Sequence, residues 1–231
     1  MRAILTPILF VCLVTACNNL KDQGGNGDAL KPDTSDINWS IESEFDQKVL
    51  AYEDENRHIW QKPDRIIDLL GDIQDKTVAD LGAGTGYFAF RLLSKAKKVI
   101  ALDIDEQFID FMLDKKKLLP LNKQERFEIR LATPENPMLG IGEADAVLVV
   151  NTYVYIEDRL NYFRNLKRFM SPGAKLLIIE FKMKDLPEGP PPEEKISLSE
   201  VEQELKQAGY AQITSDDQTL DYQYIITAIS P

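Results

Sequence analysis

Hydrophobic residues follow two alternating spacings from about residue 41 onward. Short and nearly continuous apolar runs are typical of buried strands, and apolar residues recurring every three or four positions between them predict helices. The strand-like runs cover residues 76–82, 97–104, 126–132, 144–151 and 175–182. The expected helices cover residues 87–96, 106–119 and 158–170, and a turn is expected at 171–174. This alternation indicates a parallel sheet covered by helices on both faces.

The two ends of this region depart from the alternation. Before the first strand, residues 41–52 have helical spacing, and a short helix is expected with Pro63 in its first turn and Gly71 near its end. After a helix at 197–210, strand-like runs at 210–216 and 220–230 follow each other with only a short turn, so they are expected to pair antiparallel. The sequence predicts a three-layer, doubly wound α/β domain over residues 41–231, with a seven-stranded, mostly parallel sheet and an antiparallel C-terminal hairpin.

Residues 1–40 have a different character. Arg2 precedes an apolar stretch of about a dozen residues, shorter than the roughly 20 that span a bilayer, and "VTAC" ends at Cys17. This pattern resembles a bacterial lipoprotein signal, which implies cleavage after residue 16, acylation of Cys17 and a location in the cell envelope outside the cytoplasm. The alternative is a secretory signal or short anchor that contains a cysteine. Residues 17–40 are polar and rich in Gly, Asn and Asp, which is typical of a flexible tether.

Charge and cysteine content exclude several classes of function. The chain has a net charge of −11, whereas nucleic-acid binding requires a basic surface, so no nucleic-acid partner is expected. The only cysteines are Cys12 and Cys17, so the region after residue 40 has no disulfide, cysteine metal site or cysteine nucleophile. No metal site of Asp and Asn ligands is evident either.

The stretch "VADLGAGTGYF" at residues 78–88 predicts a ligand-binding turn between a strand and a helix. Glycines at 82, 84 and 86 let a backbone approach a ligand closely, beside the N–H groups that begin a helix. A dinucleotide fingerprint would need glycine at position 87, where Tyr87 stands. Asp103, at the end of the second strand, is placed to accept ribose hydroxyls of either NAD or S-adenosylmethionine.

Taken together, "VADLGAGTGYF", "ALDID" and the C-terminal hairpin resemble the class I S-adenosylmethionine-dependent methyltransferases, over about residues 60–229. The resemblance implies a Rossmann-like methyltransferase fold and S-adenosylmethionine as cofactor. It implies that the glycine turn lines the methionine and ribose moieties, that Asp80 lies near the cofactor amine, that Asp103 accepts both ribose hydroxyls and that Ile104 packs on the adenine. Asn151 would border the methyl-transfer site. The implied cofactor-binding residues are Asp80, Gly82, Ala83, Gly84, Gly86, Asp103, Ile104, Ala132 and Asn151. Asp80 is alternatively an acid that only stabilises the turn, and Asp103 a cap of the next helix.

Two departures from the family pattern stand out. Leu131 and Ala132 occupy the place where many relatives offer an acid to the adenine amine, which leaves only the Ala132 backbone N–H. Val154 and Tyr155 stand where similar proteins often carry two histidines.

The catalytic residue is not identified by sequence. His58, the only histidine, and the two tyrosines Tyr153 and Tyr155 are candidates for contact with the acceptor, and each is equally a packing or surface residue. Trp60 and Gln61 are possible parts of a lid, and the proline-rich segment 187–194 either rims the acceptor pocket or is a stiff connection.

The expected function is methyl transfer to a small or lipid-like acceptor. The expected location is a difficulty, because S-adenosylmethionine is not expected outside the cytoplasm. A binding module that keeps the fold without turnover is therefore the alternative, and an NAD-dependent oxidoreductase is disfavoured by Tyr87 and by the terminal hairpin.

Overall fold

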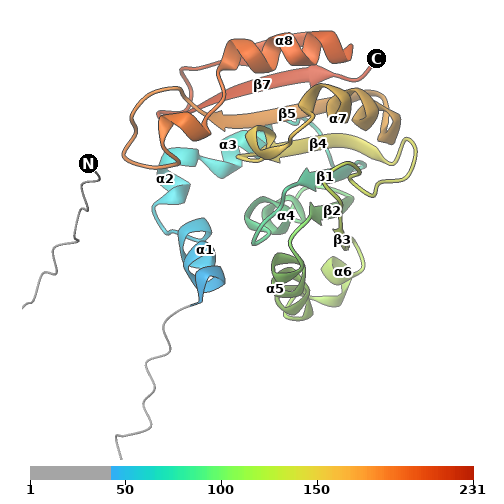
Figure 1. Cartoon of the computed structure of the whole chain (residues 1–231). Helices are drawn as coiled ribbons and strands as arrows, with labels where there is room; N and C mark the ends of the chain where they lie inside the picture. The colour runs from blue at the N-terminus through green and yellow to red at the C-terminus, as the bar shows by residue number, and fades with distance from the viewer. Residues whose placement is uncertain (1–42) are drawn as a thin grey trace, which may run out of the picture. The chain divides into compact units, whose positions relative to one another are not determined.

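The computed structural model describes residues 43–231 (Figure 1). The expected signal segment, the acylated Cys17 and the tether lie outside the described residues. Within the described part, no helix combines the length and the apolar character that crossing a bilayer demands.

A single seven-stranded sheet forms the centre of the fold, with strand order β3-β2-β1-β4-β5-β7-β6 (Figure 1). Strands β1 to β5 are parallel, whereas β7 runs antiparallel between β5 and β6. The strands are β1 (Thr77–Leu81), β2 (Lys98–Asp103), β3 (Phe127–Leu131), β4 (Ala144–Val150), β5 (Met170–Phe181), β6 (Ala211–Asp216) and β7 (Gln223–Ile229). The predicted seven strands, mostly parallel direction and antiparallel hairpin are confirmed.

Helices cover both faces of the sheet. On one face α3, α4 and α5 bury Ile66, Leu92 and Met112 against β1 and β2. On the other face α7 and α8 bury Phe163 and Leu205. The helices are α1 (Glu44–Tyr52), α2 (Arg57–Gln61), α3 (Pro63–Asp68), α4 (Tyr87–Leu92), α5 (Glu106–Lys117), α6 (Leu121–Gln124), α7 (Arg159–Leu166) and α8 (Leu198–Ala208), with 3-10 turns η2 (Tyr153–Tyr155), η3 (Lys167–Phe169) and η4 (Pro192–Glu194).

The expected turn at 171–174 is wrong, because these residues lie inside β5. Met170 pairs with Ala144 and Lys175 pairs with Ala146. Between these two pairs the chain advances by five residues in β5 but by only two residues in β4, so β5 contains extra residues. Gly173, with φ of +77°, supplies the bend within this bulge, and its N–H donates to the carbonyl of Ser230 at 2.8 Å. The turn residues are therefore absorbed into a β-bulge rather than ending the strand.

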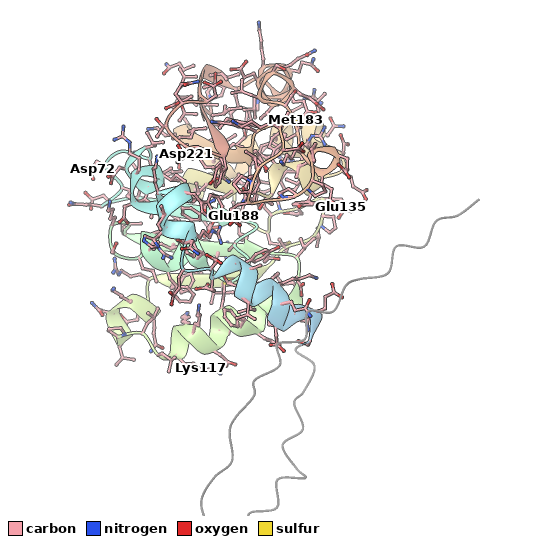
Figure 2. The ribbon with its side chains drawn as sticks, turned by 90° about the vertical axis from the view of Figure 1, so that its left-hand side faces the viewer. Asp72, Lys117, Glu135, Met183, Glu188 and Asp221 are labelled. Carbon is pink, nitrogen blue, oxygen red and sulfur yellow. The ribbon has the colours of Figure 1, made fainter. Side chains whose placement is uncertain are left out.

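The order of the strands places a binding site at one edge of the sheet. From β1 the chain moves outward through β2 and β3, and it then crosses to β4 and β5 on the other side of β1. Ligands of open α/β sheets bind at such a reversal, outside the carboxyl ends of the two central strands. Figure 2 views the molecule from the side on which α1 lies, and the labelled Glu188 of the proline-rich segment is near the middle of this view.

Candidate functional site

The turn between β1 and α4 has the backbone conformation that its glycines predict. Gly82, Gly84 and Gly86 have φ values of +74°, +54° and +81°, in the left-handed region that favours glycine. The N–H groups of Gly82 and Ala83 both donate to the Leu102 carbonyl, at 2.8 and 3.0 Å. These bonds hold the turn against the end of β2.

Side chains at two of these positions are excluded by close neighbours. A Cβ added at Gly82 would overlap the side chain of Thr152, which follows β4, and one added at Gly86 would lie 2.7 Å from the ring of Phe90. The glycine turn therefore fits tightly against both the end of β4 and the start of α4.

Asp103 joins this turn to the end of β2. Its Oδ2 accepts the Gly84 N–H at 2.7 Å, and its Oδ1 accepts the Asp105 N–H at 3.0 Å. The side chain is 9% exposed, and burial raises the pKa of its carboxyl. An ionised carboxylate offers about four acceptor positions, so Asp103 keeps acceptor capacity for a hydroxyl donor besides these backbone N–H groups. Asp103 therefore stabilises the glycine turn and still fits a ribose diol, whereas the side chain that caps the next helix, α5, is that of Asp105.

Asp80 is buried at the end of β1 with an unpartnered oxygen. Its Oδ2 has no hydrogen-bond partner among the described residues, and the same is true of the buried hydroxyls of Thr85 and Tyr87. Burial is the largest cause that raises the pKa of Asp80 to about 7. Buried polar groups are normally hydrogen-bonded, so the Asp80 carboxyl fits a ligand that brings its own donors, such as the ammonium group of an amino acid.

Helix α1 and the segment after it form one side of the same region. Tyr52 stacks on Phe108 of α5 with ring centroids 5.5 Å apart, and its ring would lie 3.3 Å from a Cβ at Gly84. The Arg57 guanidinium lies 4.1 Å from the centroid of the Tyr87 ring. The N-terminal helices therefore bring an aromatic ring and a cation to the glycine turn.

Ile104 and Ala132, the residues expected at the adenine, differ in the contacts that they can make with a ligand. Ile104 is 61% exposed and leaves an apolar surface beside Asp103 for an aromatic base. The N–H of Ala132 instead donates to the Asp103 carbonyl at 2.8 Å. That N–H is therefore used within the sheet and is not free for the adenine.

Asn151 follows β4 directly and has a φ of +55°, a conformation that asparagine tolerates better than most residues. Its N–H continues the sheet by donating to the Ile179 carbonyl at 2.9 Å. Its side-chain Oδ1 accepts from Nε2 of Gln223 on β7 at 2.5 Å. The side chain is thus fixed by a residue of the last strand.

The three catalytic candidates lie in different environments. Tyr153 is fully buried, stacks on Phe163 at 4.5 Å and donates its hydroxyl to Glu204 at 2.7 Å, so it is a packing residue. His58 is exposed on α2, where its Nδ1 contacts the Glu55 carbonyl. Tyr155 is 63% exposed at the end of η2 and remains available to an acceptor.

Glu180 is a buried acid near the end of β5 that sequence reasoning did not single out. Its Oε1 accepts the Tyr153 N–H at 2.7 Å, and burial raises the pKa of its carboxyl to about 7. It therefore holds the turn that carries Tyr155. Among residues 43–231 there is no group of three or more His, Cys, Asp or Glu side chains arranged to hold a metal ion.

Known proteins resemble both the sequence and the fold. A methyltransferase domain family matches residues 79–176. The tRNA U34 carboxymethyltransferases of Actinobacillus succinogenes and Mannheimia succiniciproducens are 29% and 28% identical over 120 and 118 residues. These matches cover 52% and 51% of this chain but only 36% of each relative, so the chain corresponds to about a third of their length.

Solved structures extend the likeness to nearly the whole described region. A SAM-dependent methyltransferase from Aquifex aeolicus has a TM-score of 0.74 and 25% identity, covering 80% of this chain and 98% of its own. Phosphoethanolamine N-methyltransferase 2 of Haemonchus contortus, solved with S-adenosyl-L-methionine, has a TM-score of 0.61 and 15% identity, covering 74% of this chain and 53% of its own.

Proposed function

We propose that this chain, which carries the domain of a class I S-adenosylmethionine-dependent methyltransferase with S-adenosylmethionine as its cofactor, transfers a methyl group to a small or lipophilic acceptor. The observation that carries the proposal is the Asp103 carboxylate, which fixes the glycine turn through Gly84 and keeps acceptor capacity for a ribose hydroxyl. Ile104, which follows Asp103 and is 61% exposed, offers an apolar surface for the adenine of the same ligand.

Different residues around the glycine turn are proposed to bind different parts of the cofactor and the acceptor. S-adenosylmethionine supplies an activated methyl group on a sulfonium centre, so positioning accounts for much of the rate. In this proposal Asp103 holds the ribose, Asp80 receives the amino-acid end, and Asn151 faces the acceptor. The Asp80 oxygen without a partner supports this division, because the ligand's ammonium group would satisfy it.

A small acceptor is favoured over a nucleic acid by charge. The net charge of −11 repels a phosphate backbone, and protein affinity for nucleic acids depends on lysine and arginine contacts with phosphates. A tRNA acceptor is the second candidate, because relatives that match half of this chain are named tRNA U34 carboxymethyltransferases. Transfer of labelled methyl groups to bulk tRNA by the purified chain would favour this second candidate.

Calorimetry of the full-length chain with S-adenosylmethionine, S-adenosylhomocysteine and NAD tests the proposal. We expect both sulfur ligands to bind and NAD not to bind. Failure of both sulfur ligands would overturn the proposal. Binding of both without conversion of S-adenosylmethionine, in the presence of extracted small molecules and lipids, would favour a binding module that does not turn over.

We also infer that Cys17 is acylated and anchors the domain in the bacterial envelope. The inference rests on the "VTAC" segment and on the polar composition of residues 18–40. Growth of expressing cells with an alkyne-tagged fatty acid should label the wild-type chain and not the Cys17→Ser variant. An unlabelled wild-type chain would contradict the anchor and leave the methyltransferase proposal unchanged.

A further inference from the structure

A line of hydrogen-bonded polar side chains, the middle two of them buried, connects the N-terminal helix α2 to the end of β4. Arg57 Nε donates to Gln61 Oε1 at 2.5 Å, and Gln61 Nε2 donates to Gln223 Oε1 at 3.1 Å. Gln223 Nε2 then donates to Asn151 Oδ1 at 2.5 Å. Gln61 and Gln223 are fully buried although they are 162 residues apart in the chain. We call these four residues the amide relay.

The polarity of the amide relay is set at its arginine end. A guanidinium has five N–H donors and no acceptor, so Gln61 must turn its oxygen toward Arg57. The amino group of Gln61 then faces Gln223, which must present its oxygen in turn. The same constraint passes to Asn151, whose oxygen faces the amino group of Gln223. Each amide orientation therefore follows from the fixed donor character of Arg57.

The last member of the amide relay turns its amino group away from the other three. Asn151 Oδ1 is occupied by Gln223, and Nδ2 has no acceptor among the residues that the structure describes. Asn151 immediately follows β4 and precedes Thr152, whose side chain packs on Gly82 of the ligand-binding turn. The free N–H donors of Asn151 therefore lie at the carboxyl end of β4, next to the glycine turn.

Resting on the methyl-transfer function proposed above, we propose that Asn151 donates a hydrogen bond to the acceptor atom, and that this atom is an ionised oxygen, a phenolate or carboxylate, rather than an amine nitrogen. An ionised oxygen has three lone pairs. One attacks the methyl group, and another can accept the hydrogen bond from the Asn151 N–H. A neutral amine uses its one lone pair in the attack and needs acceptors for its own N–H groups, which Asn151 in this orientation cannot provide.

The chemistry balances without a base from the protein. A lone pair on oxygen forms the new O–CH₃ bond while the S–CH₃ bond breaks, and its electron pair returns to sulfur, giving a neutral methyl ether or ester and a neutral thioether. An acceptor that arrives ionised has already given its proton to water. This agrees with the positions of His58, exposed on α2, and Tyr153, bonded to Glu204 in the core.

Two probes of the same shape test the proposal by binding rather than by activity. The full-length chain is saturated with S-adenosylhomocysteine and titrated with 4-nitrophenolate or with 4-nitroaniline, which carries N–H donors instead of an anionic oxygen. We expect the phenolate to bind at least about tenfold more tightly, the amount that one hydrogen bond to a charged group supplies. Equal binding, tighter binding of the aniline, or binding of neither probe to the complex overturns the proposal.

Variants of the amide relay test the stated cause. In Gln223→Glu, the new carboxylate accepts from both Gln61 and Asn151, which turns the Asn151 oxygen toward the acceptor and should reverse or abolish the preference. Asn151→Asp keeps the contact with Gln223, replaces the free amino group by an oxygen and should have the same effect even if Gln223→Glu folds poorly. Gln218→Glu, an exposed change of equal charge on the β6–β7 connection, should keep the wild-type preference. An unchanged preference in folded Asn151→Asp contradicts the inference.

Failure of this inference is distinguishable from failure of the proposed function. Absence of S-adenosylhomocysteine binding overturns the function and the inference with it. Binding of S-adenosylhomocysteine without a preference for the phenolate overturns only the inference.

Discussion

The carboxylate of Asp103 accepts the N–H of Gly84 at 2.7 Å and so ties the end of β2 to the middle of the glycine turn. One side chain thereby shapes the turn and offers the acceptor positions that a ribose needs. Asp103→Ala should lower the affinity for S-adenosylhomocysteine by roughly 30-fold to 1,000-fold, because about 2–4 kcal/mol of charged hydrogen bonding is lost. Isothermal titration measures this directly.

Asp105→Ala is the matched control for that change. Asp105 caps α5 by accepting the Gln107 N–H at 2.9 Å, so its loss should cost about 1 kcal/mol of stability and leave the affinity nearly unchanged. Equal losses of affinity in both variants would mean that Asp103 acts only through the fold.

Gly82→Ala should destabilise the protein far more than an alanine at another left-handed glycine. The added Cβ meets the Thr152 side chain and the residue keeps a φ of +74°, so overlap and backbone strain combine to cost about 3 kcal/mol or more. Gly142→Ala, with a φ of +64° and no atom within 4 Å of the new Cβ, should cost only about 1 kcal/mol. Urea unfolding of both variants compares them, and similar midpoints would contradict the close fit of the turn.

The pKa of Asp80, raised by burial from 3.8 to about 7, couples cofactor binding to pH. The folded, ligand-free protein holds a proton that the unfolded chain has released, so this stabilisation is complete below pH 3.8 and is lost as the pH rises through 7. An ammonium group placed beside Asp80 favours the ionised form, so binding at about pH 6 should release close to one proton, and affinity should rise with pH up to about 7.

Calorimetry in two buffers of different ionisation enthalpy counts that proton. Asp80→Asn should bind more weakly and release none. The Glu180 carboxyl, whose pKa is also raised to about 7, is retained in this variant and controls for the rest of the site. The same proton release in Asp80→Asn would assign the effect to another group.

Tyr153 and Tyr155 should respond oppositely to substitution. Tyr153→Phe removes the hydrogen bond to Glu204, which keeps its contacts with Arg159, and should cost about 1 kcal/mol of stability with little change in turnover. Tyr155→Ala removes an exposed ring and should leave stability within about 0.5 kcal/mol while changing the apparent KM for the acceptor. A large loss of turnover in folded Tyr153→Phe would contradict its role as a packing residue.

The strands and the glycine turn could be predicted from sequence because their signals are local. Strands of a parallel sheet are apolar on both faces, and the spacing of Gly82, Gly84 and Gly86 depends on the backbone alone. The amide relay could not be predicted in this way, because Gln61 and Gln223 meet only in the folded chain. The one sequence feature that pointed to the amide relay was Gln223, a polar residue at the start of a mostly apolar strand. Pro172 and Gly173 led to the wrong prediction of a turn at 171–174, because residues that favour turns also occur in a β-bulge inside a strand.

The position of β7 between β5 and β6 has a consequence for how the protein is made. Strand β6 pairs with β7, and Gln223 at the start of β7 orients Asn151. Neither the sheet nor the contact between Gln223 and Asn151 can be completed before β7 has left the ribosome. A chain that ends before residue 223 has the residues of the glycine turn and Asp103 but lacks the side chain that orients Asn151, so the contact between the last strand and β4 forms only after translation of β7.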